Sequence, residues 1–213
     1  MAAIREEEAR GEGFTYLADL QLQKSDFGGA RASLAAAGYT GDYQTFRLSQ
    51  IVWARARAGD VSGAIAIADR LSEGSGKGDA LCYVAAAQTD RGDQASAKQT
   101  LARAHLLVDR MPEASDKAGI LRNIAGEETR AGDAEGAKAT YAESVRIAGM
   151  FETAGSLITS LQYIAETQIK TGDFAAAAAT VALLAATNKA SPIPRAYALT
   201  GLAKGMLDAA KPK

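Results

Sequence analysis

The sequence predicts an all-α fold: a right-handed α-solenoid of about five antiparallel helical hairpins, followed by a C-terminal capping helix. Three observations lead to this prediction. A short turn signal recurs five times along the 213 residues. Apolar residues on both sides of each signal follow the helical period, and no segment shows the alternation typical of a β-strand. Internal repetition at a period of about 20–50 residues is typical of repeat architectures.

The turn signal is a Gly-Asp pair, with Ser-Asp in the first copy. Its five copies are Ser25-Asp26, Gly59-Asp60, Gly92-Asp93, Gly132-Asp133 and Gly172-Asp173. Glycine ends a helix well because it adopts the left-handed conformation without steric strain. An aspartate then caps the next helix by accepting hydrogen bonds from free backbone N–H groups. Each pair therefore predicts a helix, a tight turn and a second helix.

Apolar positions recur at fixed distances from each turn signal. We expect the alanine four residues after each aspartate to pack where two helices cross closely. These alanines are Ala30, Ala64, Ala97, Ala137 and Ala177. Before each turn come a large apolar residue, a second one three residues later and then a mostly small residue. They are Phe14, Leu17 and Ala18; Leu48, Ile51 and Val52; Leu81, Val84 and Ala85; Leu121, Ile124 and Ala125; and Leu161, Ile164 and Ala165.

This periodicity divides the chain into three parts. We expect residues 1–10 to form an N-terminal tail or a frayed first turn, 11–192 the repeat array, and 193–213 the capping helix and a tail. The predicted helices are 12–24, 27–37, 44–58, 61–72, 78–91, 94–110, 114–131, 134–149, 152–171, 174–187 and 194–208. Asp42 is predicted to cap the third of them. The last one would cover the apolar face at the end of the stack.

These residues resemble the tetratricopeptide repeat, whose pattern combines large apolar and small residues on the first helix with an alanine on the second. The clearest copies are Leu121, Ile124, Ala125, Gly132-Asp133, Ala137 and Tyr141, and Leu161, Ile164, Ala165, Gly172-Asp173, Ala177 and Val181. Leucine or phenylalanine replaces the family's tryptophan, its proline is mostly absent, and the last two spacings between turn signals exceed the usual 34 residues or so. A generic α-solenoid is the alternative. The resemblance implies a concave groove, lined by the first helix of each hairpin, that binds peptides.

Composition argues against several classes of protein. The net charge is -1 and no block of basic residues is present, which disfavours a nucleic-acid binder. Cys82 is the single cysteine, so no intramolecular disulfide can form. No apolar run approaches the roughly 20 residues that span a bilayer. We therefore expect a soluble monomer or weak homo-oligomer, cytoplasmic, or periplasmic if a signal peptide has been removed.

Residues that would suggest catalysis or metal binding are few. His105 is the single histidine, and with Cys82 it supplies too few ligands for zinc. The segment from Gly74 to Gly78 is similar to a phosphate-binding loop, but Leu71 stands where that motif requires its first glycine. We interpret this segment as a flexible loop between the second and third repeats. The sequence predicts no catalytic residue, no metal site and no cofactor.

Candidate binding residues lie one step beyond the expected core on the first helix of each hairpin. They are Tyr16, Asp19, Gln50, Trp53, Arg57, Tyr83, Arg122, Asn123, Arg130, Gln162, Glu166 and Lys170, and the same tracing includes Ser49 and Cys82. Trp53 can anchor a partner or fill space against the neighbouring repeat. The arginines can bind carboxylate or phosphate groups or remain solvated on the helix surface.

We expect from these observations a non-catalytic scaffold that binds a protein or peptide in a concave groove. Two alternatives are open at this point. One is a self-assembling structural scaffold. The other is a groove that binds a small molecule or polysaccharide, with Glu166 and Asp19 as the carboxylates that an enzymatic role would use.

Overall fold

The computed structural model describes residues 2–151, 154–187, 200, 201 and 203, and over these residues the chain forms ten helices and no strand. The helices are α1 (Ala2–Gln23), α2 (Phe27–Ala36), α3 (Gly41–Ala58), α4 (Val61–Arg70), α5 (Ser75–Asp90), α6 (Gln94–Val108), α7 (Ala114–Arg130), α8 (Ala134–Ala148), α9 (Ala154–Thr171) and α10 (Phe174–Thr187). The prediction of an all-α chain is confirmed. None of the described helices is long and apolar enough to cross a membrane.

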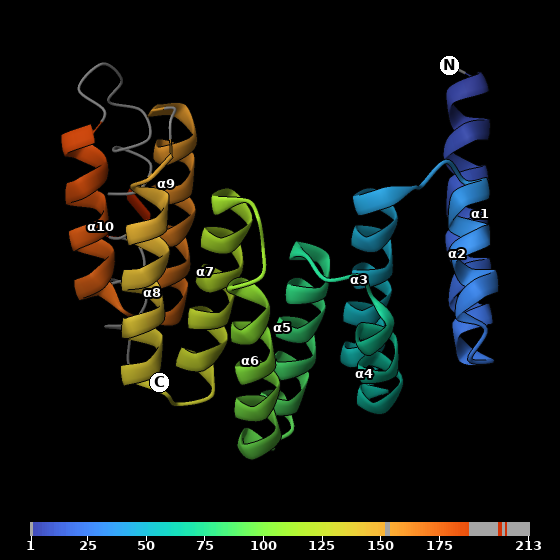
Figure 1. Cartoon of the computed structure of the whole chain (residues 1–213), viewed down its shortest axis with the longest axis horizontal. Coiled ribbons are helices and arrows are strands. Elements are labelled where there is room, and N and C mark those ends of the chain that lie inside the picture. The colour runs from blue at the N-terminus through green and yellow to red at the C-terminus, as the bar shows by residue number, and fades with distance from the viewer. Residues whose placement is uncertain (1, 152–153, 188–199, 202, 204–213) are drawn as a thin grey trace.

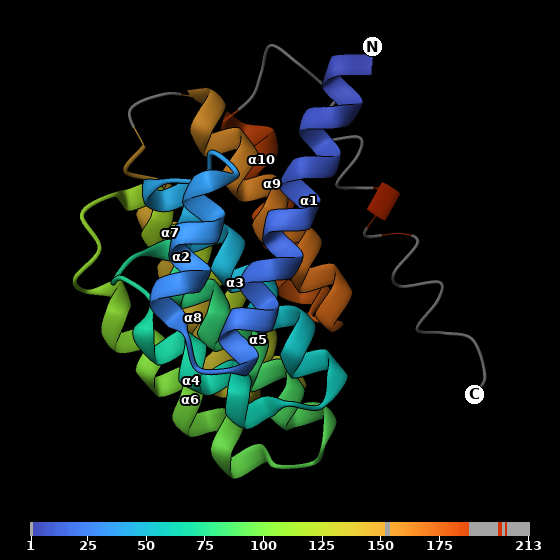
Figure 2. The same ribbon diagram turned by 90° about the vertical axis from the view of Figure 1, so that its right-hand side faces the viewer.

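Each odd-numbered helix packs against the even-numbered helix that follows it, forming five hairpins. The hairpins lie in a row (Figure 1), and an end view places α1 and α2 in front of the others (Figure 2). Within the row α3, α5, α7 and α9 pack side by side in that order, and each even-numbered helix up to α8 also contacts the next odd-numbered one. The odd-numbered helices therefore share one side of the row.

The five turns have the predicted local chemistry. The four turn glycines have positive φ angles of 106°, 78°, 80° and 84°, and Ser25 has a φ of 60° in the first turn. Each turn aspartate accepts a hydrogen bond from the backbone N–H three residues later, at 2.8–3.1 Å. Such a bond satisfies one of the N–H groups left free at a helix start. The predicted helix–turn–helix units are confirmed at all five positions.

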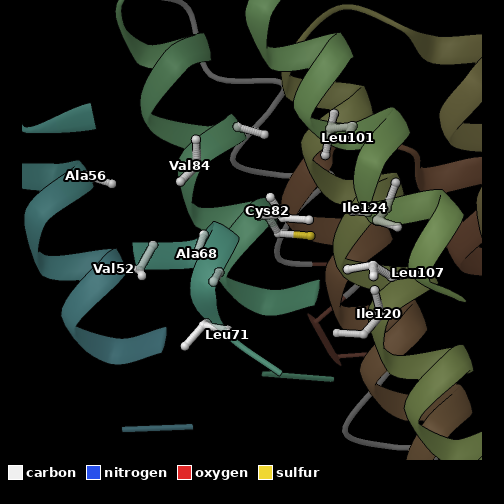
Figure 3. Close-up of a cluster of buried hydrophobic side chains, with 14 of the residues drawn as sticks. Val52, Ala56, Ala68, Leu71, Cys82, Val84, Leu101, Leu107, Ile120 and Ile124 are labelled. Carbon is white, nitrogen blue, oxygen red and sulfur yellow. The ribbon is translucent and has the colours of Figure 1, made fainter. Parts of the chain in front are cut away.

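The expected core is buried in four of the five hairpins and incomplete in the first. All five alanines after the turns are buried, and so are the apolar residues before the turns from α3 onward. Figure 3 shows part of this core, with Val52, Val84 and Ile124 from three successive odd-numbered helices. In α1, by contrast, Leu17 is 41% exposed. The prediction for Leu17 is wrong because polar contacts, described below, join α1 to α3.

A buried polar pair, which the repeat pattern did not include, recurs inside three hairpins. The hydroxyl of Thr100 donates to Gln88 Oε1 at 2.8 Å, and the hydroxyl of Thr180 donates to Gln168 Oε1 at 2.9 Å. The Ser33 hydroxyl and the Gln21 side-chain amide lie 2.7 Å apart in the first hairpin. Each pair joins the first helix of a hairpin to the second. Buried polar groups need such partners because an unsatisfied one is costly.

Several predicted boundaries are wrong. Helix α1 begins at Ala2 instead of residue 12. Thr40, not Asp42, is the N-cap of α3, and Asp42 lies in the first turn. The segment from Gly74 opens helix α5 instead of forming a loop, since Gly74 is the N-cap. The Lys77 amine there donates to two backbone carbonyls at the end of α4. The predicted capping helix lies outside the described residues, apart from residues 200, 201 and 203.

Candidate binding groove

Two adjoining cavities lie on the side of the row formed by the odd-numbered helices. One, of about 750 Å³, is lined by residues of α5, α7 and α9. The other, of about 390 Å³, is lined by α3, α5, the residue after it, and α7. Tyr83, Glu127 and Arg130 line both cavities. We call the two cavities together the groove. It thus extends over four successive odd-numbered helices.

Seven of the twelve predicted binding residues line the groove. They are Trp53, Arg57, Tyr83, Arg122, Asn123, Arg130 and Lys170. Gln50 lies beside them, within hydrogen-bonding reach of the Tyr83 hydroxyl.

The other four predicted residues lie outside the two cavities. Tyr16 is exposed on α1. Asp19, also on α1, accepts from Arg55 Nε at 3.0 Å, and its backbone carbonyl accepts from Arg55 Nη2 at 3.0 Å. On α9, Gln162 donates to Glu166 at 3.1 Å. The structure therefore does not bring Asp19 and Glu166 into one site.

Two residues that the sequence predicts on the binding face, Ser49 and Cys82, are buried. Ser49 is fully buried and its hydroxyl donates to the carbonyl of Phe46 at 2.7 Å. Thr45, one turn earlier on α3, lies against Gly76 at the start of α5, so this side of α3 is packed and not open. Cys82 borders the 750 Å³ cavity but is buried, and burial raises the pKa of its thiol. The expectation that Ser49 and Cys82 face a partner freely is therefore wrong.

A polar network occupies the middle of the groove. Asn123 donates from Nδ2 to Asp79 Oδ1 at 2.9 Å, and its Oδ1 accepts from Arg122 Nη2 at 2.9 Å. Burial raises the pKa of the Asp79 carboxyl, and burial also lowers the pKa of the Arg122 guanidinium. The network thus places one carboxylate and one guanidinium in a partly desolvated setting, with an amide between them.

A second network lies where the two cavities meet. Arg130 donates to Glu127 at 2.6 Å and also to Asp90. Burial raises the pKa of Glu127, while Arg130 acts in the opposite direction. Asp79 and Glu127 were not predicted as site residues. Both lie one helical turn from a residue that was, Asp79 before Tyr83 and Glu127 after Asn123, so a step of four residues would have found them.

Two arginines of the groove cover aromatic rings. The guanidinium carbon of Arg57 lies 4.9 Å from the centroid of the Trp53 ring, and that of Arg122 lies 5.4 Å from the Tyr163 centroid. Trp53 is 41% exposed and Tyr163 is 51% exposed. Trp53 therefore does not serve only to fill space against the next repeat. Tyr163 was not selected from the sequence, although it follows Gln162 on α9.

Metal-binding groups do not gather in the part of the chain that the structure describes: no three His, Cys, Asp or Glu side chains there could hold an ion together. His105 lies on α6, away from the groove, with its Nε2 2.9 Å from Glu128 Oε1 on α7. This contact joins the third hairpin to the fourth. His105 therefore has a structural role between two hairpins.

A known protein resembles this chain in fold and not in sequence. No protein-family model matches the chain, and no curated protein matches it in sequence. The crystal structure of Ton1535 from Thermococcus onnurineus NA1 is similar, with a TM-score of 0.59 and 16% sequence identity. The match covers 92% of this chain and 58% of the Ton1535 chain. At this identity the likeness shows a shared helical architecture.

The groove offers a ligand exposed ring surfaces, guanidinium donors and partly desolvated carboxylates. Aromatic and arginine side chains contribute most to binding energy at protein interfaces, whereas a nucleophile beside a base would indicate covalent catalysis. Here Asp79 is held by Asn123, and Glu127 by Arg130. The chemistry of the groove therefore favours recognition.

Proposed function

We propose that the chain is a tetratricopeptide-like, right-handed α-solenoid that binds a protein or peptide in the groove and catalyses no reaction. The five capped turns and the side-by-side packing of the odd-numbered helices support the solenoid. The likeness to Ton1535 supports a helical architecture and carries no information on function. In such arrays the first helices of the hairpins form an extended concave surface suited to binding.

One observation carries the binding proposal: residues that the repeat pattern predicts on four helices line one groove. A groove of about 750 Å³ with a 390 Å³ extension is elongated across helices, which suits an extended chain better than a compact ligand. Exposed Trp53 at one end and solvent-exposed Lys170 at the other supply apolar and charged contacts. Asp79, Asp90 and Glu127 of the groove already have hydrogen-bonding partners, which argues against an acid–base pair poised for catalysis among them.

The test is selection from a random library of twelve-residue peptides displayed on phage. Wild-type protein is compared with a groove variant, Trp53→Ala with Lys170→Ala, in which both altered side chains are exposed. The matched control carries Leu106→Ala and Lys138→Ala, which are exposed on α6 and α8. Circular dichroism verifies that all three proteins are folded.

We expect peptides that bind the wild type and the control and lose at least tenfold in affinity for the groove variant. Selection that yields no peptide above the background of bare support would count against the proposal. Peptides that bind the groove variant as well as the control would also refute it, since they would place the binding surface elsewhere.

A further inference from the structure

The two arginine–aromatic contacts of the groove share a geometry that indicates what they bind. We call them the two stacks, Arg57–Trp53 and Arg122–Tyr163. In each, the guanidinium carbon lies over the aromatic ring, 4.9 Å and 5.4 Å from the ring centroid. The N–H donors of a guanidinium point outward in its plane, and a contact with a ring uses none of them. Arg122 donates from Nε and Nη2 to Asn123 Oδ1, and its remaining donors can reach a ligand. Stacking also restricts a long side chain that would otherwise lose rotamer freedom on binding.

Neither stacked arginine has a carboxylate partner among the described residues. Five other arginines there do: Arg55, Arg103, Arg110, Arg130 and Arg146 each form an ion pair within 4.0 Å, whereas no ion pair is present at Arg31, Arg47, Arg70 and Arg91. Asp79 and Glu166 attract Arg122 only from beyond that distance. Arg122 is thus partly buried without a counter-ion in contact, an arrangement that an anionic ligand group would stabilise.

Three of the four carboxylates of the groove are already hydrogen-bonded. Arg130 binds both Asp90 and Glu127, and Asn123 binds Asp79. Five arginine and lysine side chains line the groove against these three and Asp116, although the whole chain has a net charge of -1. The groove therefore carries one more positive than negative charge on a protein that is otherwise slightly acidic.

We propose that the groove takes an extended acidic peptide, with one side-chain carboxylate at each stack; this rests on the proposed function of the groove. A carboxylate accepts two parallel hydrogen bonds from a guanidinium edge. Neighbouring residues of the peptide can pack on the exposed rings of Trp53 and Tyr163. An acidic peptide gains at both stacks, whereas a basic one would face Arg57 and Arg122 directly.

The fold sets the spacing of the two carboxylates. Arg57 on α3 and Arg122 on α7 are separated by α5, which lies between those helices (Figure 1). Neighbouring helix axes lie about 8–10 Å apart, and α3 and α7 are separated by two such spacings. Along the helix axis the two arginines are offset by about eight residues, at 1.5 Å per residue. Together these distances give a separation on the order of 20 Å between Arg57 and Arg122. An extended chain covers this distance in about six residues. The peptide should therefore place its two acidic residues about six positions apart.

Trp53 gives a direct test, because it is the single tryptophan of the chain and belongs to one stack. Its emission is followed while deca-glutamate is added, and the anisotropy of fluorescein-labelled deca-glutamate serves as a second readout. We expect saturable binding of deca-glutamate, none of deca-glutamine or deca-lysine, and at least a tenfold loss of affinity in Arg57→Gln and in Arg122→Gln. The matched control Arg146→Gln removes the same charge from α8 and should change affinity by less than twofold.

Four results would overturn this inference. One is the absence of deca-glutamate binding by both readouts. Another is an equal loss of affinity in Arg146→Gln, which would mean a diffuse charge effect. Stronger binding of a ten-nucleotide oligothymidylate would also reject the peptide as the occupant. The phage selection assumes no charge, so groove-dependent peptides without acidic residues would remove this inference and leave the proposed function intact.

Discussion

Thr100→Val tests the polar pair that recurs inside the hairpins. The substitution conserves the shape of the side chain and removes the hydroxyl that donates to Gln88 Oε1 at 2.8 Å. Both residues are buried, so water cannot replace the lost donor. A buried acceptor left without a partner costs about 1–3 kcal/mol. We expect the free energy of unfolding to fall by that amount.

The double variant Gln88→Leu with Thr100→Val separates this explanation from a simple packing defect. When both partners become apolar, no unsatisfied group remains, and the net cost should be close to zero. The two substitutions should therefore be coupled by about 1 kcal/mol or more, with the double variant more stable than the sum of the single ones. Thr159→Val, on the exposed surface of α9, is the matched control and should lie within about 0.5 kcal/mol of the wild type.

Urea unfolding followed by far-ultraviolet circular dichroism measures these differences. Hydrogen exchange in α5 and α6 is the second probe, because repeat arrays can unfold in parts. If Thr100→Val costs no more than Thr159→Val, the hydrogen bond does not stabilise the hairpin. If the double variant is as unstable as the sum, its members act independently and the reasoning fails.

Four further substitutions test other parts of the structure. Leu121→Ala should lower the free energy of unfolding in urea by about 2–5 kcal/mol because the side chain is buried. Gly132→Val should lower it by more than about 1 kcal/mol because the φ angle of Gly132 is 80°. Near-wild-type stability of both variants would contradict the observed packing. Asp19→Asn should speed hydrogen exchange in α1 and α2 alone by weakening the contact with Arg55, and unchanged exchange would exclude that role. The raised pKa of Asp79 means that its ionisation opposes folding as the pH rises above about 4. The free energy of unfolding of Asp79→Asn should therefore exceed that of the wild type at pH 7 and equal it below about pH 3.5. A constant difference between the two proteins across this range would refute the raised pKa of Asp79.

The turns could be predicted from the sequence because their chemistry is local. A glycine such as Gly132 and an aspartate such as Asp133 determine a left-handed residue and a cap within a few bonds of each other. The alanine four residues later follows from the same geometry. No distant part of the chain has to be known for these features, which explains why all five turns match.

The first hairpin could not be predicted in the same way, because its packing depends on contacts between hairpins. The pattern places Leu17 in the core, yet Arg55 reaches from α3 to Asp19, and Arg47 donates to Thr15 at 3.3 Å. These polar contacts take the place of an apolar interface between α1 and α3. A repeat pattern describes what one hairpin buries and does not describe how closely the next one approaches.

Only part of the groove lining could be predicted from the sequence, because it too depends on how helices approach one another. Tracing one line of residues along each helix finds Tyr83 and Asn123, but it misses Asp79 and Glu127 one turn away. More than one row of residues on each helix lines a groove between helices. The number of rows depends on how the helices are rotated toward one another. Tyr163 joins the site only because α9 brings its ring beneath Arg122.

One position in the repeat shows how the chain joins its hairpins. It lies four residues before the glycine or serine of the turn and is occupied by Gln21, Arg55, Gln88, Glu128 and Gln168. Where it is glutamine, the side chain bonds within its own hairpin. Where it is charged, it reaches the preceding hairpin: Arg55 binds Asp19 as well as Asp60 of its own hairpin, and Glu128 contacts His105. Salt screens charged contacts and acts little on neutral buried ones, so ionic strength should loosen the joints between hairpins before the hairpins themselves. Glu128 is next to Glu127 of the groove. The contact between Glu128 and His105 therefore also helps to position the groove residues of α7.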